Sequence, residues 1–137
     1  MTIKFLEHTA DVKFQASGKS IEEAFIESAR ALNETIYGKI KIKRELKKEI
    51  KSQGTDMEAL LYNFLEEFLY LLDAECFLVA KIEEIEINDK NFTLKAVLSG
   101  DDSRNYEFSN HVKAITYNEM FVKKQGNKFV CQVVLDV

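Results

Sequence analysis

The residues with the clearest potential for chemistry are two aspartates, one near each end of the chain. Asp11 closes the segment His8-Thr9-Ala10-Asp11, and Asp136 precedes Val137, the last residue of the sequence. Two aspartate carboxylates and the carboxylate of Val137 would supply the oxygen ligands that calcium and magnesium prefer. Calcium takes about six to eight oxygens, so backbone carbonyls or waters would have to complete the shell. From spacing alone, the simpler interpretation is two solvated carboxylates at the ends of strands.

A second unusual residue is Lys113, a lone cation in the apolar segment 112–117. If this segment is a strand, Lys113 shares one face with Ile115 and Tyr117, and Thr116 lies on the other face. A lysine in such a place most often extends its charged end to the surface. Held rigidly on a strand, it can also contact a phosphate or a carboxylate of a partner.

Other kinds of chemistry find little support. The two histidines and two cysteines, at positions 8, 76, 111 and 131, lack the spacing of a zinc site. Cys76 and Cys131 lie in apolar runs, which predicts buried and unreactive thiols. The segment 17–20 contains Gly-Lys-Ser but lacks the earlier glycine of a phosphate-binding loop, and a helix cap explains it.

Periodicity predicts an α+β fold with a mixed or antiparallel sheet and two main helices. Capping boxes at 20–23 and 55–58 open helices that run to residue 37 and over 56–73. We expect strands at 12–16, 77–87, 92–98, 112–124 and 128–137, with a polar loop at 99–103. Twice a strand and a helix lead into further strands, which suggests two strand–helix–strand–strand units, one nested in the other.

Two segments have alternative interpretations. Residues 39–51 hold seven Lys or Arg residues and are interpreted as an edge strand that is charged outward to prevent edge-to-edge pairing. The alternative is a basic surface that binds RNA. The wide apolar face of helix 56–73 predicts burial, and the alternative is a surface for a partner or for the clients of a general chaperone.

Length and composition indicate one domain, spanning 1–137, with a core of its own. The net charge of −4 weighs against broad nucleic-acid binding, without excluding a local basic patch. The first residues lack the apolar stretch of a signal peptide, and no run is long enough to span a membrane. We therefore expect a cytoplasmic protein with no membrane partner and no DNA partner.

Taken together, the motifs resemble the archease family. The resemblance is carried by the HTAD-V segment at 8–12, GKSIEEAF at 18–25, VKAITY at 112–117 and LDV at 135–137, and more weakly by LSGD at 98–101. Order, spacing and length agree over essentially the whole chain. The HTAD and VKAxTY segments are fairly specific in combination, although each alone would be weak.

The resemblance implies an accessory protein, not an enzyme. Archeases are partners of the RtcB-type RNA ligase of tRNA splicing, and they promote guanylylation of the ligase's histidine and hence multiple turnover. By resemblance, Asp11, Asp136 and Val137 bind a divalent cation, with calcium as the first expectation and magnesium or manganese also suitable. His8, Lys113 and Thr116 are implied as contacts to the partner, and tRNA is reached only through the ligase.

Two positions depart from the family pattern. Asn118 stands where the family usually has histidine, and an amide cannot titrate. Lys13 stands where a glycine or small residue is expected. Rival functions remain open at this stage: a metal-dependent hydrolase that uses Asp11 and Asp136, an RNA-binding module that uses residues 39–51, or a general chaperone that uses helix 56–73.

Overall fold

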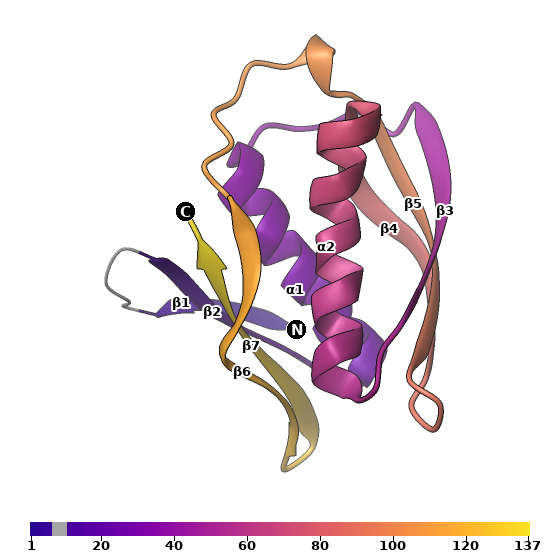
Figure 1. The fold of residues 1–137 in the computed structure, drawn as a ribbon, viewed down its shortest axis with the longest axis vertical. Helices are drawn as coiled ribbons and strands as arrows, with labels where there is room; N and C mark the ends of the chain where they lie inside the picture. Colours follow the sequence, from indigo (N-terminus) through magenta and orange to yellow (C-terminus); the bar gives the residue numbers. More distant parts are fainter. Residues whose placement is uncertain (7–10) are drawn as a thin grey trace.

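The computed structural model describes residues 1–6 and 11–137, which form two helices between two antiparallel sheets (Figure 1). In chain order the elements are β1 (Thr2–Leu6), β2 (Asp11–Gly18), α1 (Ile21–Tyr37), β3 (Leu46–Gln53), α2 (Met57–Glu75), β4 (Phe77–Asn88), β5 (Thr93–Asp102), the short 3₁₀ turn η1 (Ser103–Asn105), β6 (Ala114–Gln125) and β7 (Lys128–Asp136).

The topology is nested, as the sequence predicts. The first and last strands form one sheet in the order β1-β2-β7-β6, and the middle strands form a second sheet in the order β3-β5-β4. Every pairing is antiparallel. The α+β class is therefore confirmed, with two separate sheets in place of one. The consequence for function is that β2 and β7, from opposite ends of the chain, lie side by side.

Helix α1 begins where the capping box predicts. The Ser20 hydroxyl accepts a hydrogen bond from the Glu23 N–H at 3.1 Å, and the Glu23 carboxylate accepts one from the Lys19 N–H at 2.7 Å. Gly18 precedes this turn, and a Cβ there would lie 2.4 Å from the Glu23 Cβ. The helix ends at Gly38, whose φ of 71° glycine adopts without steric cost.

Helix α2 lies in the core and contacts strands of both sheets. Its N-cap is Asp56, whose carboxylate accepts from the Ala59 N–H at 2.7 Å, so the expected cap at Thr55 was wrong by one residue. The apolar face is buried, as expected, and comprises Leu60, Leu61, Phe64, Leu65, Phe68, Leu69 and Leu71. A chaperone surface on this face would require the helix to leave the core.

Three further expectations need correction. Residues 2–6 form an additional strand, β1. The basic segment enters the sheet only at Leu46, so 39–45 is not strand, although β3 is an edge strand as predicted. Residues 99–102, expected in a polar loop, are the end of β5, and 99–101 are buried.

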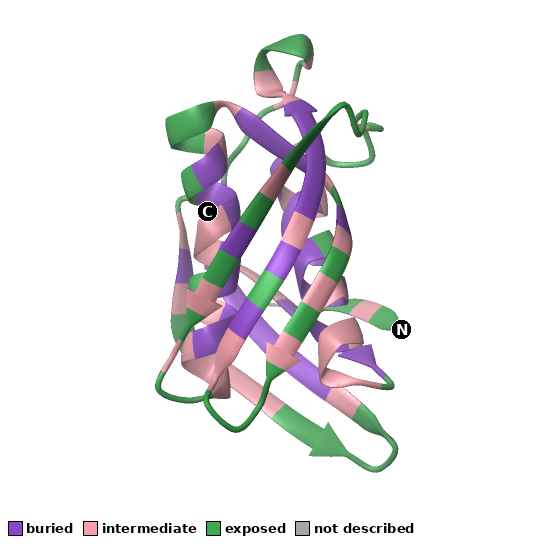
Figure 2. Cartoon of the chain, turned by 90° about the vertical axis from the view of Figure 1, so that its right-hand side faces the viewer, coloured by how far each residue is buried: buried purple, intermediate pink, exposed green. Residues whose placement is uncertain are grey.

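The outer face of the β3-β5-β4 sheet is open to solvent, as the alternation of buried and exposed residues shows (Figure 2). In the described part of the chain, no helix is long and apolar enough to cross a membrane.

Candidate functional site

The strand register brings the two predicted aspartates together. Asp11 is the register partner of Asp136 across β2 and β7, although 124 other residues separate them in the sequence. Directly opposed residues have Cβ atoms about 5 Å apart and side chains on the same face of the sheet. That face is the outer one, because the next residues, Val12 and Leu135, pack into the core.

The surroundings leave this acidic pair accessible. Asp136 is exposed and Asp11 is half-buried, and the following residue, Val137, is also half-buried. The main chain of Asp136 is fixed on its other side, since its carbonyl accepts from the Lys113 N–H at 2.7 Å. The pair, which we call the acidic edge, is therefore a partly exposed anionic site at the ends of the two central strands of the sheet.

Lys113 lies beside this edge but not inside the strand. β6 begins at Ala114, the register partner of Asp136, and the exposed side chain of Lys113 precedes it. The expected placement of Lys113 within a strand was therefore wrong by one residue, although its N–H bond to the Asp136 carbonyl keeps it next to the acidic pair.

Thr116 has a role inside the fold. Its hydroxyl donates to the Val134 carbonyl at 2.8 Å and accepts from the Asn118 N–H at 3.3 Å. These bonds fix the start of an irregularity in β6, where the register with β7 breaks between Thr116 and Phe121. A hydroxyl with two intramolecular partners is occupied, which makes this residue better suited to shaping the bulge than to direct contact with a partner.

In the bulge of β6, residues 117–120, Glu119 lies on the outer face of its sheet. Glu119 adopts a φ of 55°, a left-handed conformation that non-glycine residues rarely take. Its carbonyl accepts from the Gln132 side chain at 2.7 Å, and its carboxylate pairs with Lys13 Nζ at 3.2 Å. Gln132 in turn accepts from Gln15 at 2.8 Å. This network holds the bulge next to the acidic pair and gives Lys13 a structural role.

The bulge also exposes an aromatic surface. The Tyr117 ring is 54% exposed and stacks on Tyr62 of α2, with centroids 4.2 Å apart and planes 5° apart. Asn118, the position where the family usually has histidine, is exposed beside it. Sequence analysis missed the bulge, for which the only signal was the polar pair Asn118-Glu119 inside an otherwise apolar strand.

The predicted contact His8 lies outside the described residues. Among residues 1–6 and 11–137, no three His, Cys, Asp or Glu side chains come together as a metal-binding group. A cation at the acidic pair would therefore draw further ligands from main-chain oxygens and water.

The glycine–acid segment has a structural explanation. A Cβ on Gly100 would lie 2.1 Å from the Leu78 carbonyl oxygen, so β4 and β5 approach each other too closely for a side chain. Asp101 accepts from the Tyr106 hydroxyl at 2.7 Å and from the Asp102 N–H at 2.8 Å. These hydrogen bonds lower the pKa of the Asp101 carboxyl.

The thiols are free. Cys131 is fully buried, and burial raises its pKa to about 12, as expected for an inert thiol. Cys76 is half-buried and ends α2 with a φ of 53°.

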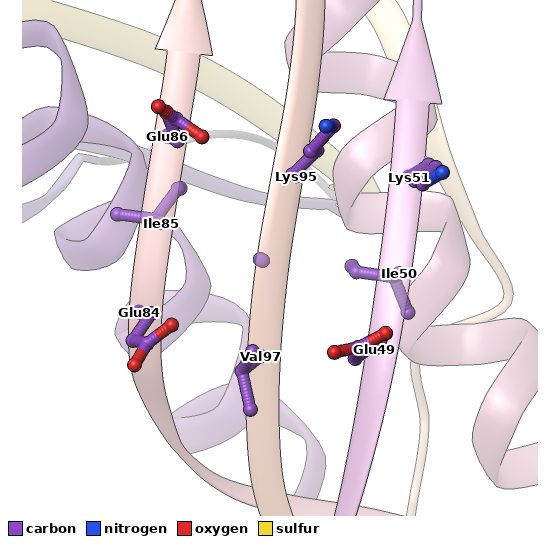
Figure 3. A pocket seen from close by; sticks show the side chains of 9 residues that line it. Glu49, Ile50, Lys51, Glu84, Ile85, Glu86, Lys95 and Val97 are labelled. Carbon is purple, nitrogen blue, oxygen red and sulfur yellow. The ribbon is translucent and has the colours of Figure 1, made fainter.

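A cavity of about 410 Å³ lies elsewhere, on the open face of the β3-β5-β4 sheet (Figure 3). Acidic Glu49, Glu84 and Glu86 and basic Lys51 and Lys95 surround a small apolar floor. This mixture of charges is typical of a solvated sheet face, and the cavity shares no residue with the acidic pair.

The fold and the site together define the class of protein: a nested α+β domain in which β2 and β7, from opposite ends of the chain, bring two aspartates together. The family model described as the Archease protein family (MTH1598/TM1083) matches residues 4–137. The chain belongs to this family.

Relatives agree with this assignment. The chain is 38% identical to Protein archease of Pyrococcus abyssi, covering 96% of this chain and 95% of the relative. It is 34% identical to Protein archease of Methanosarcina mazei, covering 98% and 94%. The fold is similar to the solution structure of Methanobacterium thermoautotrophicum protein 1598, with a TM-score of 0.82, 27% identity and 98% of each chain covered.

A second solved structure supports the fold alone. It belongs to a Thermotoga maritima archease described as a possible chaperone, with a TM-score of 0.67, 23% identity and coverage of 96% of this chain and 94% of that one.

Proposed function

We propose that this protein is an accessory factor that activates an RtcB-type RNA ligase by promoting its guanylylation and thereby its multiple turnover. The observation that supports the proposal is the cross-strand pair of Asp11 and Asp136 on an exposed edge. Membership of the archease family supports the choice of this partner, and the acidic pair offers a means of acting on it.

The acidic pair suits a divalent cation, with calcium expected first. Two carboxylates on directly opposed residues repel each other, and a cation bound between them attracts both and offsets this repulsion. Asp11, Asp136 and main-chain oxygens of Val137 would hold the ion, and magnesium or manganese would also fit such oxygen ligands. The bound ion would supply positive charge that can attract phosphate or carboxylate groups of the ligase.

Activation needs only that the protein binds one conformation of the ligase better than another. In this proposal the acidic edge enters the mouth of the ligase active site and favours the conformation that accepts the nucleotide. Lys113, exposed next to the edge, contacts a phosphate or carboxylate of the ligase. The chain itself transfers no group, and tRNA is reached through the ligase.

The test is to follow guanylylation and RNA joining by the cognate ligase with and without this protein. Wild-type protein should support many turnovers, whereas Asp11→Asn and Asp136→Asn should abolish the stimulation while circular dichroism stays unchanged. Asp89→Asn, an exposed aspartate in the turn between β4 and β5, is the matched control and should stimulate normally. Equal turnover with and without wild-type protein would remove the proposal. A phosphoester hydrolysed by the isolated protein would favour the rival hydrolase.

A further inference from the structure

A run of cations, which we call the basic strip, crosses the end of the molecule between α1 and β3 (Figure 1). It consists of the exposed residues Lys39, Lys41, Lys43, Arg44 and Lys47. In the described part of the chain, its four lysines form no ion pair, and Arg44 has one loose pair, at 3.6 Å to Glu83. One acidic residue, the exposed Glu45, lies within the strip, and the five cations still make it a local positive surface on a chain whose net charge is −4.

The backbone beneath the strip is anchored, although only its last residue, Lys47, lies in a strand. Ile42 packs against the core between two exposed lysines. The Lys43 N–H donates to the Tyr106 hydroxyl at 2.9 Å, and that hydroxyl donates to Asp101 at 2.7 Å. Fixing the backbone reduces the entropy lost when the lysine side chains take up a ligand.

A cavity of about 340 Å³ opens at the start of the strip, beside Lys39. Asn33, Tyr37 and Ile40 line it, together with Arg30 and Glu34. Asn33 is 8% exposed, and among the described residues its side-chain amide is not one of the fully buried groups that lack a partner. A side-chain amide that lines a cavity and is reached by solvent can donate to and accept from a polar ligand.

We propose that the basic strip and this cavity together bind single-stranded RNA. The lysines contact successive phosphates, and the cavity takes a base, whose edge pairs with the Asn33 amide. An acidic peptide would also satisfy the lysines, but the Glu34 carboxylate that lines the cavity would repel its acidic side chains and not a neutral base, and for this reason the observations favour a nucleic acid. The inference goes beyond ligase activation, because it gives the isolated protein its own contact with RNA.

The first experiment measures fluorescence anisotropy of a labelled RNA of about twelve nucleotides with the isolated protein. The test variant carries Lys39→Glu, Lys41→Glu and Lys43→Glu. The control variant has the same charge change at exposed lysines in or beside distant turns, Lys90→Glu, Lys124→Glu and Lys128→Glu.

Loss of three phosphate contacts should weaken binding about tenfold or more at low salt, and should lower the slope of log K against log salt by about 2. The control should lose much less. Equal losses in the two variants would overturn the proposal, because the effect would then follow net charge alone.

The second experiment tests the base pocket with Asn33→Leu, which removes the amide and keeps the bulk. Its salt slope should match wild type, while affinity falls about fivefold or more, which corresponds to one lost base contact. An unchanged affinity would remove the pocket from the proposal.

Single-stranded DNA of the same sequence tests whether the sugar contributes to binding. Equal binding of DNA and RNA still supports a surface that contacts phosphates and bases. Displacement of RNA by polyglutamate at equal charge concentration would overturn the assignment in favour of an acidic protein.

Discussion

Calcium-dependent stabilisation of the fold is the sharpest consequence of the acidic pair. A ligand that binds only the folded state stabilises it by RT ln(1 + [L]/Kd). In the unfolded chain Asp11 and Asp136 are far apart, so the site exists only after β2 and β7 pair. Calcium should therefore raise the melting temperature of this protein.

The size of the effect follows from the donor set. Two carboxylates completed by main-chain oxygens and water place the site among weak calcium sites, with Kd on the order of 10⁻⁴–10⁻³ M. At about 10 mM free calcium the gain is then about 1.4–2.7 kcal/mol. For a domain of this size, that corresponds to an increase in melting temperature of about 4–10 °C.

The assay is thermal unfolding followed by circular dichroism, with calcium or with EGTA, for wild type, Asp136→Asn and Asp89→Asn. Without calcium, Asp136→Asn should change stability by no more than about 0.5 kcal/mol, because its side chain is exposed and its backbone bonds remain. With calcium, Asp136→Asn should lose most of the gain, while Asp89→Asn keeps it. The same calcium shift in all three proteins would refute the reasoning, since the ion would then bind elsewhere.

Two further predictions concern stability. Thr116→Val removes the hydrogen bond to the Val134 carbonyl and should cost about 1 kcal/mol in urea unfolding, whereas Thr116→Ser should stay near wild type; the reverse ranking would contradict a structural role for the hydroxyl. Because burial raises the Cys131 pKa to about 12, above its ordinary value of 9.0, the folded state keeps a proton that the unfolded state loses above pH 9. Stability should therefore fall between pH 9 and 12, by at most about 1.4 kcal/mol per pH unit from this group. Cys131→Ala should remove that part of the alkaline slope in urea titrations, and an unchanged slope would contradict it.

Both helices and the nested order of elements could be predicted from the sequence, because each rests on a local signal. Ser20 and Glu23 form the predicted cap of α1, and in the structure each side chain accepts a hydrogen bond from a backbone N–H. The apolar residues of α2 are spaced along one face, which is buried. Such signals depend on neighbours within a few residues, which a single sequence displays directly.

The basic segment shows where a local signal misleads. Ile40 and Ile42 alternate with lysines and resemble a strand, but this segment crosses from α1 to the second sheet, and no strand among residues 1–6 and 11–137 pairs with it. Its backbone is instead held by a side chain, the Tyr106 hydroxyl, from 63 residues away. No periodicity in one sequence reveals a tertiary partner of that kind.

The contacts around the candidate site were also beyond sequence reasoning. Lys13 looked like an unexplained departure, and it pairs with Glu119 across three strands of the sheet. The positive φ of Glu119 and the shift of register in β6 depend on Gln132, whose side chain lies on the outer face of β7 and is nevertheless buried beneath the bulge. The resemblance to the archease family identified Asp11 and Asp136 as site residues, whereas only the register of β2 and β7 shows that they lie opposite each other.

The dependence on register ties function to the completion of folding. β7 is a central strand between β2 and β6, and Leu135 is fully buried next to the exposed Asp136. A slip of one residue would exchange the faces of these two neighbours, which would place the carboxylate in the core and the leucine in water. The acidic edge therefore forms only when the first and last strands of the nested fold have paired correctly, and changes that disturb the pairing of β7 should abolish it even when both aspartates are intact.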